Sequence, residues 1–282
     1  MPETIAVLNA GGAQSHAIAR RLEGAGYTVR RLSRQDGPGL TQVDTESESS
    51  LQRALEGAAG AVLTLHQDYR PGAREAYVTR VVLAAEAAGV GRIVLNTAGA
   101  VYEDSDLPVA VDLRKLRSIV QDGAVPVVTL QPTVYLDNLL APWAVPAIVN
   151  DGVLAYPAPT NAAVSWLSHD SLAAFVTAAF KKAVAGRTFE IGGPEPLTGA
   201  ELAAVVGATI GQLVTYQALP LDGFAAGLNA AFGAPAGDII AGLYRHLEDH
   251  PRAVTRDPGA WAELGVQPER AEAWAARQTW AA

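Results

Sequence analysis

Apolar and polar residues alternate along the first half of the chain in a pattern that predicts strands and helices in turn. Five short runs rich in β-branched residues have the length of buried strands, and Ala-rich stretches with helical spacing separate them. We expect strands at residues 4–8, 28–32, 61–65, 92–96 and 127–130. Helices are expected at about residues 14–25, 49–55, 73–88 and 109–121, each ended by a glycine, namely Gly26, Gly57, Gly89 and Gly123. This alternation predicts an α/β fold with a doubly wound parallel sheet.

The second half of the chain is less regular. Prolines interrupt residues 132–159, which we interpret as a loop-rich insertion that faces a ligand. Regular signals return with a helix at about residues 168–182 and a strand at residues 188–191. Thr198 and Glu201 then have the spacing of a capping box, which indicates the start of another helix.

The two halves of the chain are expected to form different parts of one folded unit. We expect residues 1–135 to hold the main sheet and residues 136–282 to form a smaller, mostly helical substrate region. No repeat, low-complexity tract or clear linker separates them, so the second part is expected to pack directly on the first.

The composition excludes several classes of protein. The chain has 282 residues, with 21 Lys and Arg against 29 Asp and Glu, and a formal net charge of −8. This charge opposes the phosphate neutralisation that nonspecific nucleic-acid binding depends on, so we expect no direct nucleic-acid partner. The absence of cysteine excludes disulfides, thiolate zinc sites and a catalytic thiol.

No segment has the pattern of a membrane anchor. The N-terminal residues lack the basic stretch of a signal peptide. The apolar run at residues 139–149 is too short to cross a bilayer and contains Pro142 and Pro146. We expect a cytoplasmic protein without a membrane partner.

The first predicted strand leads through small residues into the first predicted helix, which is the context of a dinucleotide site. Small residues let the backbone approach a pyrophosphate, and a helix N-terminus offers free N–H donors. A tight turn without a ligand needs glycine as well, so this segment alone leaves both readings open. The candidate loop residues are Asn9, Gly11, Gly12, Ala13, Gln14 and Ser15.

Three later segments carry more specific motifs. Residues 131–138 read Gln-Pro-Thr-Val-Tyr-Leu-Asp-Asn, residues 168–173 read Ser-His-Asp-Ser-Leu-Ala, and residues 193–198 read Gly-Pro-Glu-Pro-Leu-Thr. In this order they resemble the Arg-Pro-x-x-Phe-x-x-Asn, Asp-Ile-Ala and Gly-Pro-Glu-x-Leu-Thr motifs of the NmrA-like family of atypical short-chain dehydrogenases/reductases. The resemblance covers about residues 3–280.

The glycine loop departs from the family pattern. The family's Gly-x-x-Gly-x-x-Gly positions are Asn9, Gly12 and Ser15 here, so two of three glycines are replaced. Asn tolerates a positive φ and can keep the turn, and Ser is small enough for the close approach of helix and strand.

The resemblance implies a Rossmann-type domain that binds NADP(H) or NAD(H), followed by a small substrate region. Besides the loop residues, it places at the cofactor Arg34, Asp44, Leu65, His66, Thr97 and Pro132. The end of the second strand favours NADP(H) over NAD(H), because it reads Arg-Arg-Leu-Ser-Arg at residues 30–34 and offers no carboxylate to the ribose until Asp36. A guanidinium suits a 2′-phosphate. The alternative is that these arginines are a solvated strand end.

The usual catalytic pair of short-chain dehydrogenases, Tyr-x-x-x-Lys, is absent. Lys115 is a candidate for holding the nicotinamide ribose. However, alignment back from Pro126 puts the family's lysine near Leu113, and the alternative is that Lys115 is a solvated surface residue. Tyr135 stands where the family usually has Phe. We expect its ring at the nicotinamide end of the cleft and its hydroxyl as the donor to a bound carbonyl, with core packing as the alternative.

Without a dedicated proton donor, a quinone is a suitable acceptor, because it can take hydride directly and protons from water. The apolar run at residues 139–146, with Trp143, could form the wall that binds a flat apolar acceptor, or simply pack in the core.

Two functions follow from the resemblance. One is NADPH-dependent reduction of a small apolar carbonyl or quinone-like acceptor by hydride transfer. The other is a noncatalytic redox sensor that binds cofactor and a regulatory protein. A homodimer is compatible with either function.

Two further patterns resemble functional sites but are better explained by local structure. His246 and His250 have metal-binding spacing but no third ligand nearby, so no metal site is expected. Ser168, His169 and Asp170 are adjacent residues that cannot act as a catalytic triad, and they are better explained as a helix cap.

Overall fold

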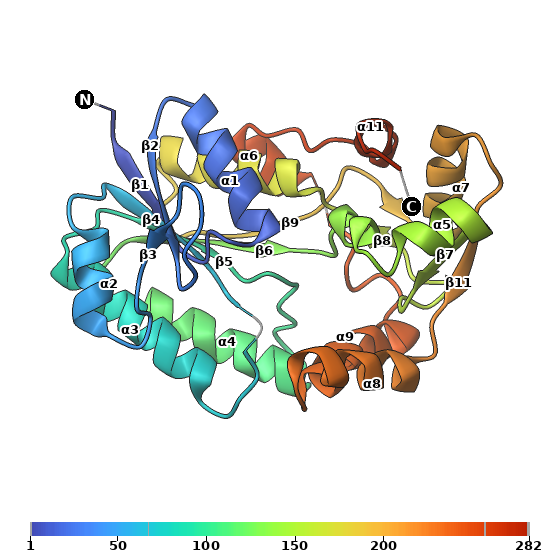
Figure 1. Ribbon diagram of the computed structural model, residues 1–282, viewed down its shortest axis with the longest axis horizontal. Helices are drawn as coiled ribbons and strands as arrows, with labels where there is room; N and C mark the ends of the chain where they lie inside the picture. Colours follow the sequence, from blue (N-terminus) through green and yellow to red (C-terminus); the bar gives the residue numbers. More distant parts are fainter. Residues whose placement is uncertain (1, 67, 257, 281–282) are drawn as a thin grey trace.

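The computed structural model describes residues 2–66, 68–256 and 258–280, and its core is a seven-stranded parallel sheet (Figure 1). The strand order β3-β2-β1-β4-β5-β6-β9 reverses direction between β1 and β4, the switch point at which such sheets bind ligands. This confirms the expected doubly wound α/β fold. The strands are β1 (Thr4–Val7), β2 (Thr28–Ser33), β3 (Thr41–Gln42), β4 (Gly60–Thr64), β5 (Ile93–Asn96), β6 (Val127–Pro132) and β9 (Thr188–Ile191).

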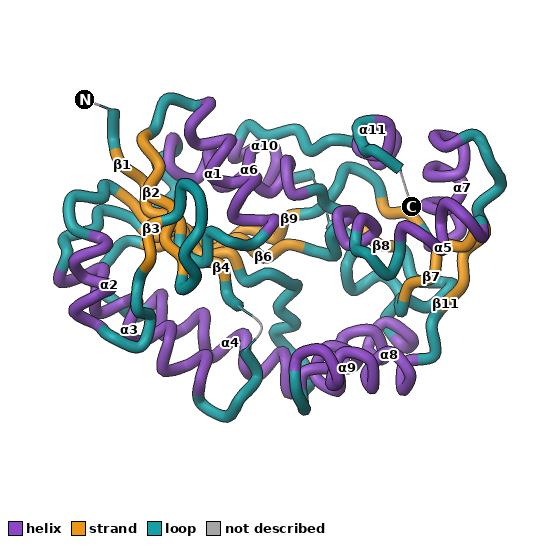
Figure 2. Tube along the Cα trace, in the orientation of Figure 1, coloured by secondary structure: helices purple, strands orange, loops and turns teal. Residues whose placement is uncertain are grey.

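Helices cover both faces of the sheet because neighbouring strand residues point to opposite sides (Figure 2). Ile5 and Val7 belong to one buried cluster, whereas Ala6 and Leu8 belong to another. The first face packs against α1 (Ala13–Gly24), α6 (His169–Lys181) and α10 (Gly259–Leu264). The second packs against α2 (Glu48–Leu55), α3 (Ala73–Ala87) and α4 (Pro108–Gln121).

The remaining elements gather beyond the carboxyl ends of the strands and have their own core, which includes Trp166 and Trp274 (Figure 1). A parallel strand pair and an antiparallel one hold this part together. Its elements are η1 (Leu136–Leu140), α5 (Val145–Asp151), β7 (Val153–Tyr156), β8 (Val164–Ser165), β10 (Pro196–Leu197), α7 (Gly199–Ile210), β11 (Thr215–Ala218), α8 (Leu221–Phe232), α9 (Ala236–Asp249) and α11 (Ala271–Ala276).

The two parts interleave along the chain. After η1, α5, β7 and β8, the chain returns to the sheet through α6, which packs on α1, and β9, which pairs with β6. Residue 135 therefore ends the first pass through the sheet without separating two independent units.

Most elements that were given bounds lie within two residues of their observed positions, whereas α8 and α9 were expected only as part of a mostly helical region. The two residues of β3 and the strands of the small pairs carry too little pattern to detect. Ser168 caps α6, and Thr198 with Glu201 forms the expected capping box on α7. No helix among the described residues is long and apolar enough to cross a membrane.

One expected helix end is corrected. Gly26, Gly57 and Gly89 have the positive φ that favours glycine after a helix, but Gly123 does not. An added Cβ at Gly123 would come within 2.7 Å of Val82 Cγ1, so close packing of α4 on α3 explains this glycine.

Candidate active site at the carboxyl edge of the sheet

The turn between β1 and α1 keeps its shape although its first glycine position is occupied by Asn9. Asn9 has φ 55°, in the left-handed region that Asn tolerates. Its side-chain amide donates to the Thr64 carbonyl oxygen at 3.1 Å, and the Tyr77 hydroxyl approaches its Oδ1 at 3.5 Å. These contacts fix a conformation that a glycine would reach without help.

The N-terminus of α1 is left without a side-chain cap. Gly12 occupies the N-cap, and the first helical hydrogen bond is donated by His16 to the Gly12 carbonyl oxygen. Within the part of the chain that the structure describes, the N–H groups of Ala13, Gln14 and Ser15 have no acceptor. Such a helix end favours an anion through its free donors and its dipole.

The second replaced glycine is accommodated inside the protein. Ser15 is buried, and its hydroxyl donates to the Leu8 carbonyl oxygen at 3.4 Å. The added Oγ therefore faces the strand and finds a partner.

Gly11 and Gly12 leave room beside their backbone. A Cβ added at Gly11 would lie 3.6 Å from Ser33 Oγ, and one at Gly12 would lie 3.7 Å from the Asn9 carbonyl oxygen. Both are ordinary contact distances, and neither glycine has a positive φ. The fold itself does not require glycine at either position.

Arg34 differs from the other arginines of the second strand region. Arg30 donates to the Ala54 carbonyl oxygen at 2.6 Å, and Arg31 pairs with Glu23 at 2.9 Å. The Arg34 side chain is exposed, and its guanidinium has no hydrogen-bond or ion-pair partner among the described residues. It is therefore available to a ligand.

Two surface pockets meet at Arg34. One, of about 440 Å³, also contains Asp44, whose carboxylate accepts from the Glu46 N–H at 2.9 Å. The other, of about 480 Å³, contains His66 and Tyr69. Burial, aided by the Arg74 cation, lowers the pKa of His66 to about 4, so this ring is neutral near pH 7.

Asn96, at the end of β5, connects the cofactor loop with Tyr135. Its amide donates to Gln14 Oε1 at 3.0 Å and to Thr64 Oγ1 at 3.4 Å. Its Oδ1 accepts from the Ala98 N–H at 3.0 Å and from the Tyr135 hydroxyl at 3.5 Å. A fully buried amide thus organises four neighbours at the switch point of the sheet.

The loop after β5 is strained where it reaches the cleft. Ala98 has φ 58°, a conformation that costs energy in any residue with a Cβ. The neighbouring Thr97 is buried and donates from Oγ1 to the Gly99 carbonyl oxygen at 2.7 Å. The hydrogen bonds of Asn96 and Thr97 hold this loop in place.

Tyr135 is buried between the sheet and the start of α6. Its ring meets the His169 ring edge-on at a centroid distance of 5.0 Å. Burial raises the pKa of Tyr135, so its hydroxyl keeps its proton. The 3.5 Å bond to Asn96 is long, and a better acceptor placed nearby could compete with it.

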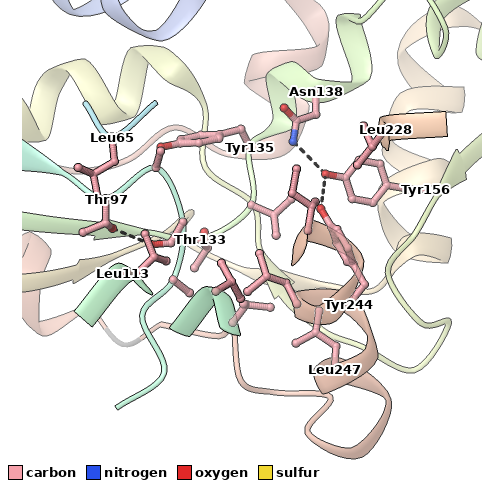
Figure 3. Close-up of a pocket in the computed structure, with 18 of the residues that line it drawn as sticks. Leu65, Thr97, Leu113, Thr133, Tyr135, Asn138, Tyr156, Leu228, Tyr244 and Leu247 are labelled. Carbon is pink, nitrogen blue, oxygen red and sulfur yellow. Dashed lines mark hydrogen bonds between the residues drawn. The ribbon is translucent and has the colours of Figure 1, made fainter. Parts of the chain in front are cut away.

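A cavity of about 260 Å³ contacts both the sheet edge and the C-terminal helices (Figure 3). One end is formed by Leu65, Thr97 and Tyr135, and the other contains Tyr156 and Tyr244. Gln14 also lines the cavity and is linked to Tyr135 through Asn96. Of the described residues that line it, only Arg74 is charged, and Asp112 pairs with that guanidinium. Its apolar lining includes Leu113, Ala141, Trp143, Phe224, Leu228 and Leu247.

The sequence profile of the NmrA-like family matches residues 1–253. The chain belongs to the NmrA-like family.

Two curated relatives of this NmrA-like chain are reductases. It is 29% identical over 246 residues to the (4-alkanoyl-5-oxo-2,5-dihydrofuran-3-yl)methyl phosphate reductase of Streptomyces griseus, a match that covers 84% of each chain. It is also 29% identical over 227 residues to quinone oxidoreductase 2 of Escherichia coli, covering 80% of this chain and 73% of the relative.

Solved structures of similar fold include an enzyme and a regulator. The NADPH complex of the NADPH-dependent quinone oxidoreductase QOR2 of Escherichia coli has a TM-score of 0.76 at 23% identity, covering 96% of this chain and 98% of that one. The negative transcriptional regulator NmrA, in complex with NAD, has a TM-score of 0.75 at 16% identity, covering 98% and 95%.

Several residues predicted for the site do not reach the cavity of this NmrA-like protein. Lys115 lies on the exposed side of α4 and pairs with Glu75 at 2.5 Å, whereas Leu113 lines the cavity, as the helix register requires. Pro132 is buried within the sheet opposite Ile191. The ribose-holding role suggested for Lys115 is therefore not supported by its position.

The apolar run at residues 139–146 contributes both to the cavity wall and to a buried core. Ala141 and the half-exposed Trp143 line the cavity, while Leu139 is fully buried in the core that includes Trp166 and Trp274. The polar residues Asn96, Tyr156 and Tyr244 were missed, because they lie far apart in the sequence and none belongs to a local motif.

The histidine patterns have local structural roles. His246 and His250 stack with a ring distance of 4.2 Å at the end of α9, and the described residues contain no group of three or more metal-ligand side chains. Ser168 accepts from the Ser171 N–H at 3.0 Å, the expected cap. His169 lies beside Asp137 through its backbone N–H, at 2.8 Å.

Proposed function

We propose that the protein is an NADPH-dependent reductase that transfers hydride to a small apolar carbonyl or quinone-like acceptor. The observation that carries this proposal is the single cavity that joins Gln14, from the cofactor loop, to an apolar wall with Leu228 and Leu247. The cofactor-loop end would hold the nicotinamide, and the apolar wall would hold a flat acceptor. The two curated reductases described above support the same reaction class.

The residues present fit a dinucleotide. The unpaired N–H groups of Ala13, Gln14 and Ser15 suit a pyrophosphate, and the room beside Gly11 and Gly12 permits its close approach. The unpartnered guanidinium of Arg34 suits a 2′-phosphate, which supports NADP(H) over NAD(H). When bound, the reduced nicotinamide supplies the hydride.

The side chains of the cavity orient the acceptor and control the proton. Leu228, Leu247 and Trp143 exclude water from one face of an apolar ring. Tyr135 stays protonated because of its burial, and its hydroxyl can donate to a carbonyl oxygen that replaces Asn96 as its acceptor. For a quinone, protons can come from water.

The test of the cofactor site is a fluorescence titration with NADPH and NADH on three proteins. We expect Arg34→Ala to weaken NADPH binding about tenfold or more and to leave NADH binding unchanged, because it removes a charged hydrogen bond to the 2′-phosphate. Arg31→Ala is the matched control, since Arg31 is engaged by Glu23. Equal affinity for both cofactors in the unmodified protein would remove the argument for NADP(H).

The test of turnover is NADPH oxidation with a panel of quinones and small apolar ketones. Steady oxidation supports the reductase. Tyr135→Phe should then lower kcat for ketones about tenfold or more without changing NADPH affinity, because general acid help is worth roughly 10²–10⁴. An unchanged rate would identify Tyr135 as a packing residue and leave direct hydride transfer to the acceptor.

A second function has one observation in its favour. With Lys115 paired to Glu75 outside the cavity, no lysine lines the cavity among the described residues, so the usual proton relay is missing. A cofactor-binding regulator would need no relay. Tight NADPH binding without oxidation of any acceptor in the panel would favour that function, with a regulatory protein as its partner.

A further inference from the structure

The far wall of the cavity carries a cluster of three polar groups that the proposed hydride chemistry does not use. Asn138 of η1 donates from its amide to the Tyr156 hydroxyl at 2.9 Å. The Tyr156 and Tyr244 hydroxyls, from β7 and α9, lie 3.0 Å apart. All three side chains line the cavity, on the opposite side from Leu65, Thr97 and Tyr135 (Figure 3).

A count of protons leaves this cluster with one donor too many. The Tyr156 oxygen accepts from Asn138, and one hydroxyl proton lies between Tyr156 and Tyr244. Whichever tyrosine donates in that bond, the other hydroxyl keeps a proton for which the described residues provide no acceptor. A buried donor without an acceptor is costly, so the cluster is suited to a ligand oxygen.

The surroundings keep this donor neutral and fixed. The Tyr244 ring meets Phe224 edge-on at 5.7 Å, and the Tyr156 ring meets Trp166 at 5.2 Å. Burial raises the pKa of both tyrosines, so neither becomes an anion that would accept instead. Tyr216 supports the strand end by donating to the Tyr156 carbonyl oxygen at 3.1 Å, but it does not line the cavity.

We infer that Tyr156 and Tyr244 form a hydrogen-bond donor site for a second oxygen of the acceptor, opposite the oxygen that faces Tyr135. This deepens the proposed function and rests on it for the identity of the ligand. A cavity with one donor at each end matches a 1,4-quinone, which carries two carbonyl oxygens on opposite sides of a flat apolar ring. A ketone with a single oxygen leaves one of the two donors without a partner.

The test is calorimetric binding to the NADP⁺-saturated protein, which requires no turnover. The probes are 1,4-naphthoquinone and 1-tetralone, which have similar rings but two carbonyl oxygens and one. We expect the unmodified protein to prefer the quinone and the Tyr156→Phe/Tyr244→Phe double variant to lose about tenfold in quinone affinity, because the ligand oxygen then has no donor.

The single variants provide the sharper prediction. Tyr156→Phe and Tyr244→Phe each remove one hydroxyl and also the bond between the two, so each still has one free proton. We expect each to lose less than about threefold, so that the double variant loses more than the two single losses combined. Tyr216→Phe is the control and should leave the binding of both ligands unchanged.

Three outcomes would overturn the inference: additive losses in the single and double variants, an equal loss for quinone and tetralone, or full quinone affinity in the double variant. The last would mean that water alone satisfies the cluster. Thermal unfolding of each variant identifies any that does not fold, and the remaining single variant with its control still tests the inference. Failure of the proposed reductase, in contrast, would appear as quinone binding without NADPH oxidation.

Discussion

Two Gly-Gly pairs follow strands of the same parallel sheet, and they differ in the space beside their backbone. Gly192 and Gly193 follow β9, and Gly11 and Gly12 lie in the turn after β1. At Gly192 an added Cβ would come within 2.8 Å of Ser165 Cβ, and at Gly193 it would overlap the Trp166 carbonyl oxygen. The space beside Gly192 and Gly193 is therefore filled by the chain itself.

The turn after β1 has no such neighbour. Its glycines would tolerate a Cβ at 3.6 Å and 3.7 Å from the nearest atoms. One pair is thus needed by the fold, and the other has a use only if something outside the chain approaches it. A dipeptide that looks the same in the sequence is structural in one turn and indicates a ligand in the other.

The largest effect is expected in the turn after β9. Gly193→Ala would force its Cβ against the Trp166 carbonyl oxygen, which belongs to backbone that cannot move aside without disturbing the β8–β10 pair. We expect a loss of about 3 kcal/mol in unfolding free energy, at the upper end for overpacked sites. Urea denaturation measures it, and a loss below about 1 kcal/mol would mean that the turn adjusts freely.

The matching change after β1 should leave the fold intact and affect binding. Gly12→Ala adds a Cβ with ordinary contacts to the protein, but that Cβ occupies space a pyrophosphate would need. We expect an unchanged unfolding midpoint and NADPH affinity lower by about 5- to 150-fold, corresponding to roughly 1–3 kcal/mol of overpacking. Normal NADPH binding by this variant would contradict the ligand role of the turn.

The comparison also shows what could be predicted from the sequence. The central strands β4, β5 and β6 were predictable because their apolar runs are buried on both faces, and the turn at Asn9 because Asn accepts a positive φ. Helix register already favoured a surface position for Lys115, with Leu113 on the inner side of the helix. Gly193 and Gly12, in contrast, differ only through residues far away in the sequence, such as Trp166.

The end of the cavity that contains Tyr156 and Tyr244 was least predictable. Tyr156 and Tyr244 are separated by 88 residues, and nothing near either one indicates the other. Side chains that meet only after β7 and α9 have packed leave no periodic signal. The cofactor end depends mainly on backbone groups and local turns, which sequence patterns do report.

The two regions also differ in the charged and titratable groups around them. The turn after β9 is flanked by compensated pairs, Arg256 with Glu190 at 3.4 Å and Arg270 with Glu195 at 2.6 Å. The segment after β4, in the pocket beside Arg34, contains His66, whose pKa is lowered to about 4 by burial and by Arg74.

Because the unfolded chain takes up this His66 proton near pH 6.5 and the folded protein only near pH 4, stability should fall as the pH drops through that window. We expect His66 to account for about 1–2 kcal/mol of this loss, after allowance for its partial exposure. Urea denaturation at pH 7 and pH 4.5 measures it, with His66→Gln as the variant. An equal loss in the variant would assign the effect to other groups.

The smallest effect is expected at Ala98, whose φ of 58° strains the loop between the two ends of the cavity. Ala98→Gly removes a conformational cost of roughly 1–2 kcal/mol and adds about 0.5–1 kcal/mol of backbone entropy. The net gain should be up to about 1 kcal/mol in unfolding free energy. A loss of stability would show that the Ala98 methyl group contributes packing that outweighs its strain.

The late return of β9 to the sheet has a consequence for synthesis of the chain. Until residue 191 has left the ribosome, β6 is an open edge of six buried residues with unpaired backbone groups, a template for pairing with other chains. A fragment that ends at residue 135 keeps that edge permanently exposed. We expect such a fragment to aggregate rather than fold as a cofactor-binding domain, so about two thirds of the chain must be made before this edge of the sheet is protected.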